Sequence, residues 1–230
     1  MAKETQKVLV VLTNTTQYGQ TTDPTGLWLG EATEFVAPLQ AAGIHVDYVS
    51  PKGGFVPLDP RSMKYTNPEI MKVYNDPDFQ QRALTHSLAA KDVSPADYAA
   101  IYFTGGHGVM WDFPDNPDLQ RLSLAIYHQG GYLTSVCHGI VGLINLKDDD
   151  GQYLIANKKI TGFTNMEERL SGKRKVVPFL SEQAAKQHGA NFQKVRAYGS
   201  FAVQDGQLIT GQNPFSPAAV AKLLLQNLSK

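Results

Sequence analysis

The 230-residue sequence has almost no cysteine and no block of charge of one sign. Its single cysteine, Cys137, cannot form an internal disulfide, so we expect a reducing compartment and a fold that does not depend on oxidation. Lysine plus arginine and aspartate plus glutamate are equal at 21 each, which gives no electrostatic reason to expect nucleic acid or an anionic membrane as a partner. A small neutral molecule fits this charge balance better.

Long apolar runs are also missing. The segment 7–12, KVLVVL, is too short for the core of a signal peptide or for a membrane span, so we expect a cytoplasmic protein. There is no internal repeat and no low-complexity segment. The length suits one domain over residues 1–230 with a full hydrophobic core.

Several motifs of common enzyme classes do not occur. The sequence has no H-E-x-x-H, no C-x-x-C, no Walker loop and no G-x-G-x-x-G after its first apolar segment. Zinc hydrolysis, dithiol exchange and nucleotide binding therefore have no positive support. Four histidines are scattered singly, as is typical of structural or exposed side chains: His45, His86, His128 and His188.

Short segments rich in β-branched and aromatic residues alternate with helical patterns. The predicted strands are residues 7–12, 44–49, 98–103, 132–136 and 159–163. A helix over residues 30–42 is predicted by an apolar stripe at Ala32, Phe35, Val36 and Leu39. Prolines that suit a first helical turn are Pro77, Pro117, Pro178 and Pro217, three of them behind a capping side chain. This alternation predicts an α/β three-layer sandwich, with a mostly parallel central sheet and helices on both faces.

Two further segments complete the predicted architecture. The pattern SFAVQDGQLITG predicts a β-hairpin around Asp205-Gly206, followed by a last helix from Ser216. Residues 51–97 are rich in loop signals, with Gly53-Gly54, prolines and one helical pattern. We interpret this segment as a lid-like excursion from the sheet.

The stretch GGYLTSVCHGIVGL contains Cys137 where a predicted strand ends and an apolar helical run begins. A nucleophile on such a turn needs small neighbours two residues away on each side, and Ser135 and Gly139 supply them. A helix start behind the sulfur would favour the thiolate. The alternative is a buried core cysteine, but the spacing favours a nucleophile elbow.

Backbone amides near this turn are candidates for an oxyanion site. The segment TGGHG follows the predicted strand 98–103, and its glycines allow close approach to a ligand. Gly106 and His107 could complete an oxyanion and substrate site with the amide of His138. An ordinary turn, and a helix-capping role for His138, are the alternatives.

Three carboxyl groups are candidates for acid and base chemistry. Glu31 flanks the buried face of the first predicted helix, at the end of the sheet where Cys137 emerges, and there it could stay protonated. A first-turn acid favoured by the helix dipole is the alternative. Glu167 or Glu168, in TNMEERL, could orient a histidine, although a capping box would also explain a glutamate at this point.

Taken together, these segments resemble the ThiJ/PfpI superfamily, whose fold resembles the class I glutamine amidotransferases. Within it the chain is most similar to the branch of heat-shock chaperones and glutathione-independent glyoxalases (glyoxalase III). The matching segments follow in order along the chain: KVLVVLT, TGLWLGEATEFVAPLQAAGIHVDYVSPKGG, DYAAIYFTGGHGVMWDFPDNPDL, GGYLTSVCHGIVGL, KKITGFTNMEE and DGQLITGQNPFSPAAVA. One departure is Ile140, where the branch usually has proline, and we expect it to alter the pocket wall.

The resemblance implies a role for each candidate residue. Cys137 would be the nucleophile, His138 its partner, Glu168 the acid that orients the histidine, and Glu31 the acid beside the sulfur. The oxyanion amides would be those of Gly106 and His138. A homodimer is implied, and no metal, since the metal-binding segment of larger chaperone members is not identified here.

The leading hypothesis is a glyoxalase that converts methylglyoxal and water to lactate without a cofactor, because the redox change is internal to the substrate. The same triad could instead hydrolyse a small amide or peptide, or remove early glycation adducts from proteins. A third reading is a stress-response holding chaperone. The sequence leaves the physiological substrate and the lactate enantiomer open.

Overall fold

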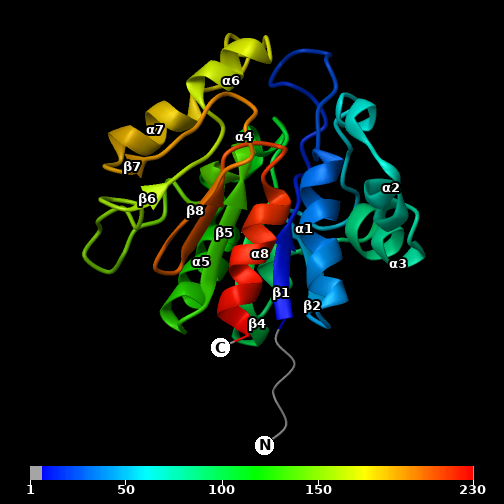
Figure 1. Ribbon diagram of the computed structural model, residues 1–230, viewed down its shortest axis with the longest axis horizontal. Coiled ribbons are helices and arrows are strands. Elements are labelled where there is room, and N and C mark those ends of the chain that lie inside the picture. The colour runs from blue at the N-terminus through cyan, green and yellow to red at the C-terminus, as the bar shows by residue number, and fades with distance from the viewer. Residues whose placement is uncertain (1–6, 230) are drawn as a thin grey trace, which may run out of the picture.

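Seven strands form the central sheet of the computed structural model, which describes residues 7–229 (Figure 1). Their order across the sheet is β3-β2-β1-β4-β5-β9-β8, and every neighbouring pair is parallel except β8 and β9. The strands are β1 (Lys7–Val11), β2 (His45–Ser50), β3 (Leu88–Ala89), β4 (Tyr98–Phe103), β5 (Tyr132–Val136), β8 (Ala202–Asp205) and β9 (Leu208–Gly211). The predicted mostly parallel sheet is confirmed.

Helices cover both faces of this sheet and make two separate hydrophobic cores. Successive residues of a strand point to opposite faces, so Val8 and Val10 of β1 enter one core and Leu9 enters the other. Helices α1 (Leu29–Ala41) and α8 (Pro217–Leu228) pack together over the first face, and α5 (Pro117–His128) covers the second. The three-layer sandwich is therefore confirmed.

The first helix follows its predicted pattern closely. Its stripe of Ala32, Phe35, Val36 and Leu39 is completely buried, and the chain leaves the helix at Gly43 with a positive φ of 76°. The predicted hairpin is also present, because β8 and β9 pair antiparallel around Gly206, which has a φ of 59°. The last helix then begins at Pro217 as expected.

Two predictions of secondary structure are wrong. The segment 159–163 is a strand only at β6 (Lys159–Ile160), which pairs with β7 (Asn191–Phe192) in a separate two-stranded sheet. The strand ends because Thr161 donates its amide to the hydroxyl of Thr210 instead of a strand neighbour. The predicted helix at Pro178 begins three residues later, as α7 (Ser181–Gln187).

The other three prolines do stand at the first helical turn, in α3 (Pro77–Phe79), α5 and α8. Asp76 and Asn116 accept capping hydrogen bonds from the following backbone. Ser216 forms no such cap, because its hydroxyl is bonded to Asn213 in the preceding loop. The third expected cap is therefore wrong.

The segment 51–97 is made of short elements beside the first face. It contains η1 (Ser62–Tyr65), α2 (Pro68–Tyr74), α3, the π-helix η2 (Gln80–Thr85), β3, η3 (Ala90–Asp92) and η4 (Pro95–Asp97). Since β3 is the edge strand of the main sheet and α2 packs on α1, this excursion is anchored at both places. Within residues 7–229, no helix has the length and apolar character needed to cross a membrane.

Candidate active site

The candidate residues meet at the carboxyl ends of the central strands. Cys137 follows β5 and opens the 3-10 helix η5 (Cys137–Gly142), and Gly106 follows the neighbouring strand β4. Glu31 lies in the first turn of α1. All three line one cavity of about 560 Å³, together with His107 and His138. This is where a parallel α/β sheet ordinarily binds its ligand.

The turn at Cys137 is sharp and tightly packed. Cys137 has a φ of 57°, in the left-handed region that residues with a side chain rarely adopt. A Cβ at Gly139 would overlap the carbonyl oxygen of Phe103, so a residue larger than glycine does not fit there. Ser135, on the other side, is fully buried. The small neighbours inferred from the sequence therefore have a steric reason.

Glu31 is completely buried at the end of the cavity beside the sulfur. Its Oε2 accepts a hydrogen bond of 2.7 Å from the amide of Gly105, and its Oε1 has no partner among residues 7–229. Burial raises the pKa of Glu31 to about 8, although hydrogen bonds from Cys137 and Gly105 oppose this shift. At neutral pH the side chain is therefore a carboxylic acid with an O–H free to donate.

The Gly105 position is closely fitted to this acid. A Cβ there would lie 2.5 Å from Oε2 of Glu31 and 3.1 Å from the Cβ of Cys137. Glycine thus allows the backbone amide to reach the carboxyl group. Sequence analysis did not single out Gly105, although the Gly-Gly pair was the available signal.

The thiol of Cys137 is not activated by its position alone. Burial raises the pKa of Cys137 well above its usual value, ionisation of Glu31 would raise it further, and the amide of His138 opposes the rise. The expected stabilisation of the thiolate by the helix start is therefore outweighed by burial. Ionisation of the sulfur requires a nearby group that accepts its proton.

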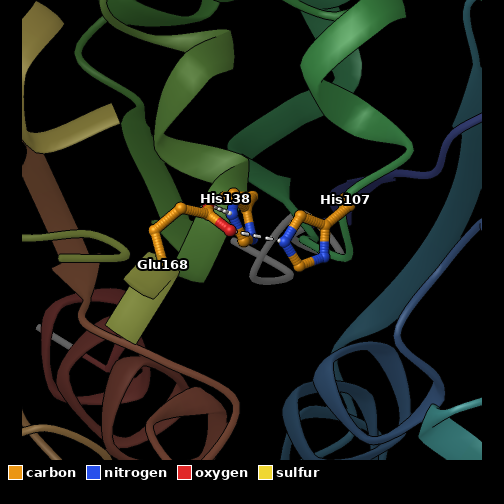
Figure 2. A group of neighbouring side chains, drawn as sticks. All are labelled: His107, His138 and Glu168. Atoms are coloured by element: carbon orange, nitrogen blue, oxygen red, sulfur yellow. Dashed lines mark hydrogen bonds and ion pairs between the residues drawn. The ribbon is translucent and has the colours of Figure 1, made fainter. Parts of the chain in front are cut away.

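His138 is placed to accept that proton. Its Nδ1 lies 3.5 Å from Sγ of Cys137, and its Nε2 lies 2.6 Å from Oε2 of Glu168, in α6 (Asn165–Leu170). Because the ionised carboxylate can only accept, His138 must carry its N–H on Nε2, which leaves Nδ1 as an acceptor facing the thiol. Figure 2 shows the rings of His138 and His107 beside this carboxylate.

Glu168 is held as an anion. Burial opposes its ionisation, but the attraction to His138 when that ring is protonated, together with the hydrogen bonds of His107 and His138, outweighs burial and holds the pKa of Glu168 well below its usual range. The carboxylate therefore stays negative over the whole neutral range. It can orient His138 and stabilise the imidazolium formed when the thiol loses its proton.

His107 lies on the other oxygen of the same carboxylate. Its Nε2 is 2.9 Å from Oε1 of Glu168 (Figure 2). Its Nδ1 is 2.9 Å from Nη2 of Arg61. Both ring nitrogens are thus engaged inside the protein, although His107 lines the cavity, and its part in the oxyanion and substrate site stays a prediction. Sequence analysis missed Arg61, which comes from the excursion 51–97 and carries no motif.

The cluster of His107, His138 and Glu168 has the residue types of a metal site, and their ligand atoms lie within 4.8 Å of one another. A metal on Nε2 of His107 would require the proton on Nδ1. Nδ1 faces Arg61, which can only donate, whereas metal-binding histidines give this proton to an acceptor. The hydrogen-bond pattern therefore suits two protonated Nε2 atoms on one carboxylate and does not fit a metal.

The amides expected to form an oxyanion site lie at the same end of the cavity. The N–H of Gly106 donates to no group among residues 7–229, and the N–H of His138 is directed at the sulfur of Cys137. Gly106 has a φ of 95°, and a Cβ there would overlap the backbone of Gly26. Ile140, by contrast, is buried in the core against Gly162 and does not line the cavity, so the expected change of the pocket wall is wrong.

The remaining walls of the cavity are mainly aromatic. They are formed by Trp28, Tyr65, Phe163, Tyr198 and Phe215. Sequence analysis did not find these residues, because they come from five separate loops and helices and have no common spacing. Trp111 and Phe113, which follow the TGGHG segment, do not line the cavity.

Glu167, the neighbour of Glu168, faces away from the histidines and holds the loops together. Its Oε2 accepts from the amide and hydroxyl of Thr164 in a capping box, and its Oε1 accepts from Tyr198, Gln212 and Asn213. In this segment Glu168 therefore contacts the histidines, while Glu167 forms the capping box.

Glu167→Gln is expected to lower the free energy of unfolding by at least about 2 kcal/mol. A glutamine has one oxygen and one NH2 group, so either orientation turns an NH2 toward two or more buried donors and leaves them without an acceptor. Urea unfolding at pH 7 measures the change. Glu69→Gln, at an exposed position of α2, is the matched control, and equal midpoints for the two variants would contradict the prediction.

Comparison with known proteins gives a consistent result. Residues 26–227 match the model of the DJ-1/PfpI family. The curated protein Glyoxalase 3 of Candida albicans is 31% identical over 227 residues, which cover 94% of this chain and 95% of that protein.

Solved structures agree with the sequence matches. The Rapid Encystment Protein 24 KDa (REP24) of Francisella tularensis is 37% identical, with a TM-score of 0.94 over 97% of this chain and 99% of the other. Glyoxalase III of Candida albicans is 28% identical, with a TM-score of 0.87 over 97% of each chain. The fold and the order of its elements are therefore shared with these proteins over nearly their full length.

Proposed function

This chain belongs to the DJ-1/PfpI family, and we propose that it is a glutathione-independent glyoxalase that converts methylglyoxal and water to lactate. The chemistry is suggested by relatives named as glyoxalases, among them Glutathione-independent glyoxalase HSP31 of Saccharomyces cerevisiae. It needs no redox cofactor, because the aldehyde carbon is oxidised while the neighbouring ketone is reduced.

One arrangement carries the proposal. A single thiol lies between a neutral carboxylic acid, Glu31, and an imidazole acceptor, His138, which is itself fixed by Glu168. An α-oxoaldehyde needs both kinds of group, because a proton must leave one carbon and another must reach the adjacent carbon. Hydrolysis of an amide or ester moves no proton between two carbons, so it does not need an acid and a base on the two sides of the nucleophile in this way.

The first step forms a hemithioacetal. His138 takes the thiol proton on Nδ1, and the sulfur of Cys137 adds to the aldehyde carbon. The carbonyl oxygen becomes an oxyanion, which we expect the amides of Gly106 and His138 to stabilise, and it then takes the proton back from His138. Glu168 compensates the transient positive charge on the imidazole.

The second step moves hydrogen between the two carbons. His138, neutral again, removes the proton from the sulfur-bearing carbon, and the carboxylic acid of Glu31 protonates the ketone oxygen to give an enediol. Protonation of the second carbon and loss of the hydroxyl proton from the first give a lactoyl thioester. Water then hydrolyses the thioester, which releases lactate and restores the thiol of Cys137.

A holding chaperone is a second candidate, and it has one specific observation in its favour. Tyr65, Leu170 and Phe215 at the rim of the cavity are each more than half exposed, which is unusual for large apolar side chains that share one opening. Hydrolysis of small amides or removal of glycation adducts would use the same thiol. A cytoplasmic location and a homodimer belong to the same proposal and rest on the single free cysteine and on the family resemblance.

The deciding test is to incubate the purified protein with methylglyoxal in the absence of glutathione and to follow lactate. We expect lactate from the wild type and none from Cys137→Ala. Lactate formation that is absent from the wild type, or unchanged in Cys137→Ala, would rule out the glyoxalase. Suppression of client aggregation that survives in Cys137→Ala would support the chaperone role as a separate property.

A further inference from the structure

A chain of hydrogen bonds continues beyond the catalytic acid, away from the cysteine. Oε1 of Glu168, the oxygen that does not contact His138, accepts from Nε2 of His107 at 2.9 Å and from the hydroxyl of Ser171 at 2.8 Å. His107 is 4% exposed and lines the cavity through its ring. The orientation of the carboxylate thus depends on groups on both of its oxygens.

Arg61 continues this series of hydrogen bonds from His107 to Asp59. Its Nη2 lies 2.9 Å from Nδ1 of His107, and its guanidinium is bound by Asp59 through contacts of 2.7 and 3.0 Å. Asp59 is completely buried, so the guanidinium is held in a fixed place. Arginine has no acceptor, so Nδ1 of His107 must keep its lone pair toward Arg61.

We propose that Arg61 and His107 are positioning residues for Glu168. Arg61 donates to Nδ1 of His107 and so prevents a proton from binding there. His107 then stays a neutral donor to Glu168, and the negative charge of the carboxylate remains available to stabilise the imidazolium of His138. A proton on Nδ1 would point at an N–H of Arg61 and place two cations side by side. An imidazole that contacts a buried carboxylate without such a block would ordinarily become an imidazolium. The pair His107⁺–Glu168⁻ would then compete with His138 for the same negative charge.

The groups that face His107 from each neighbouring element agree with a neutral ring. Arg61, which is bound by Asp59, reaches His107 from the excursion 51–97. Tyr18, in the loop before α1, has its ring centroid 5.4 Å from that of His107. His138 of η5 and Glu168 of α6 complete the surroundings. Burial, with repulsion from His138 and Arg61, lowers the pKa of His107 to about 4, against the effect of Glu168. Burial raises the pKa of Tyr18, so this phenol adds no charge.

The functional consequence concerns the acid side of the pH profile. With Arg61 in place, the ability of His138 to accept the thiol proton does not depend on the protonation of His107 near neutral pH. In Arg61→Gln, Nδ1 of His107 is free to bind a proton as the pH falls, and the resulting imidazolium competes with His138 for Glu168. Activity is then lost at a higher pH, and we expect the acid limb of kcat/KM for methylglyoxal to move to higher pH by about one unit. Arg174→Gln, an exposed arginine, is the matched control and keeps the wild-type limb.

A second substitution separates positioning from a general structural effect. Glutamine at position 107 can donate to Glu168 but cannot become a cation, so Arg61→Gln/His107→Gln should return the acid limb to its wild-type position. Asp59→Asn is added to Arg61→Gln to remove the orphaned buried carboxylate in case the single variant fails to fold, and the same shift is expected. A merely structural role of Arg61 would lower the rate equally at all pH values.

The kinetic readout rests on the proposed function, so a second readout that does not use methylglyoxal is measured on the same variants. Cys137 is the single cysteine of the chain, and its alkylation by iodoacetamide against pH reports the proton transfer from thiol to His138 directly. If the wild type forms no lactate but Arg61→Gln shifts the alkylation limb, the glyoxalase fails and the positioning role stands. The positioning role is overturned if the acid limb of the alkylation rate is unchanged in folded Arg61→Gln. It is also overturned if Arg61→Gln/His107→Gln does not return this limb to its wild-type position.

Discussion

Glu31→Gln is expected to lower kcat for lactate formation by at least about 100-fold while making the folded protein more stable above pH 5. The loss of activity follows because glutamine cannot release or accept a proton at the reacting carbons. The gain in stability follows from burial. Glutamine resembles the protonated acid, since its oxygen can accept from Gly105 and its NH2 takes the place of the free O–H.

The direction of the pH dependence follows from the two states of Glu31. In the unfolded chain this carboxyl loses its proton near pH 4.5, whereas in the folded protein its pKa is raised to about 8. Between these values the folded state holds a proton that the unfolded state has released, so the stability of the wild type falls as pH rises, by about 1.4 kcal/mol for each pH unit. The fall ends once the pH exceeds the folded pKa. Glutamine removes this contribution.

Urea unfolding at pH 5 and at pH 8 measures the effect. The difference in the free energy of unfolding between Glu31→Gln and the wild type should be small at pH 5 and should grow to several kcal/mol at pH 8. Glu69→Gln, on the surface of α2, is the control and should show no such growth. Parallel stability curves for Glu31→Gln and the wild type would show that Glu31 is ionised in the folded protein.

The architecture was predictable because its signals are local. A buried parallel strand is an apolar run, and an amphipathic helix repeats its apolar residues along one face, so β1, β4, β5 and α1 could be placed from short windows. The segment 159–163 has the composition of a strand but ends after Ile160, since Thr161 bonds to a side chain of β9. Such a tertiary contact overrides the local pattern and leaves no trace in the sequence around it.

The site was predictable only in part, for the same reason. Cys137 and His138 are adjacent, and Glu31 could be placed by its angle to the buried stripe of α1. Arg61 and His107 are 46 residues apart and their contact depends on the path of the excursion, so no spacing indicates it. The choice between Glu167 and Glu168 depends on about 100° of rotation around a helix whose start is uncertain by a residue in any sequence-based assignment.

Glu168→Gln has the largest effect on catalysis that the geometry predicts for a residue outside direct contact with the thiol. Oε2 accepts from His138 and Oε1 from His107 and Ser171, so an NH2 on either side meets an N–H or O–H group. If the NH2 faces His138, the ring must present a lone pair on Nε2 and carry its proton on Nδ1, toward the sulfur. The acceptor for the thiol proton is then lost.

We expect kcat for lactate formation to fall by roughly 10⁴-fold, the loss found when a catalytic histidine is held in the wrong tautomer. The alkylation of Cys137 by iodoacetamide near neutral pH should fall in parallel, because it needs the same proton transfer. Glu167→Gln provides the matched comparison one residue away: it should lose stability but keep a pH profile of alkylation like that of the wild type. If Glu167→Gln instead changes this profile and Glu168→Gln does not, the acid that orients His138 is Glu167, and the hydrogen bond of 2.6 Å to Glu168 has no catalytic role.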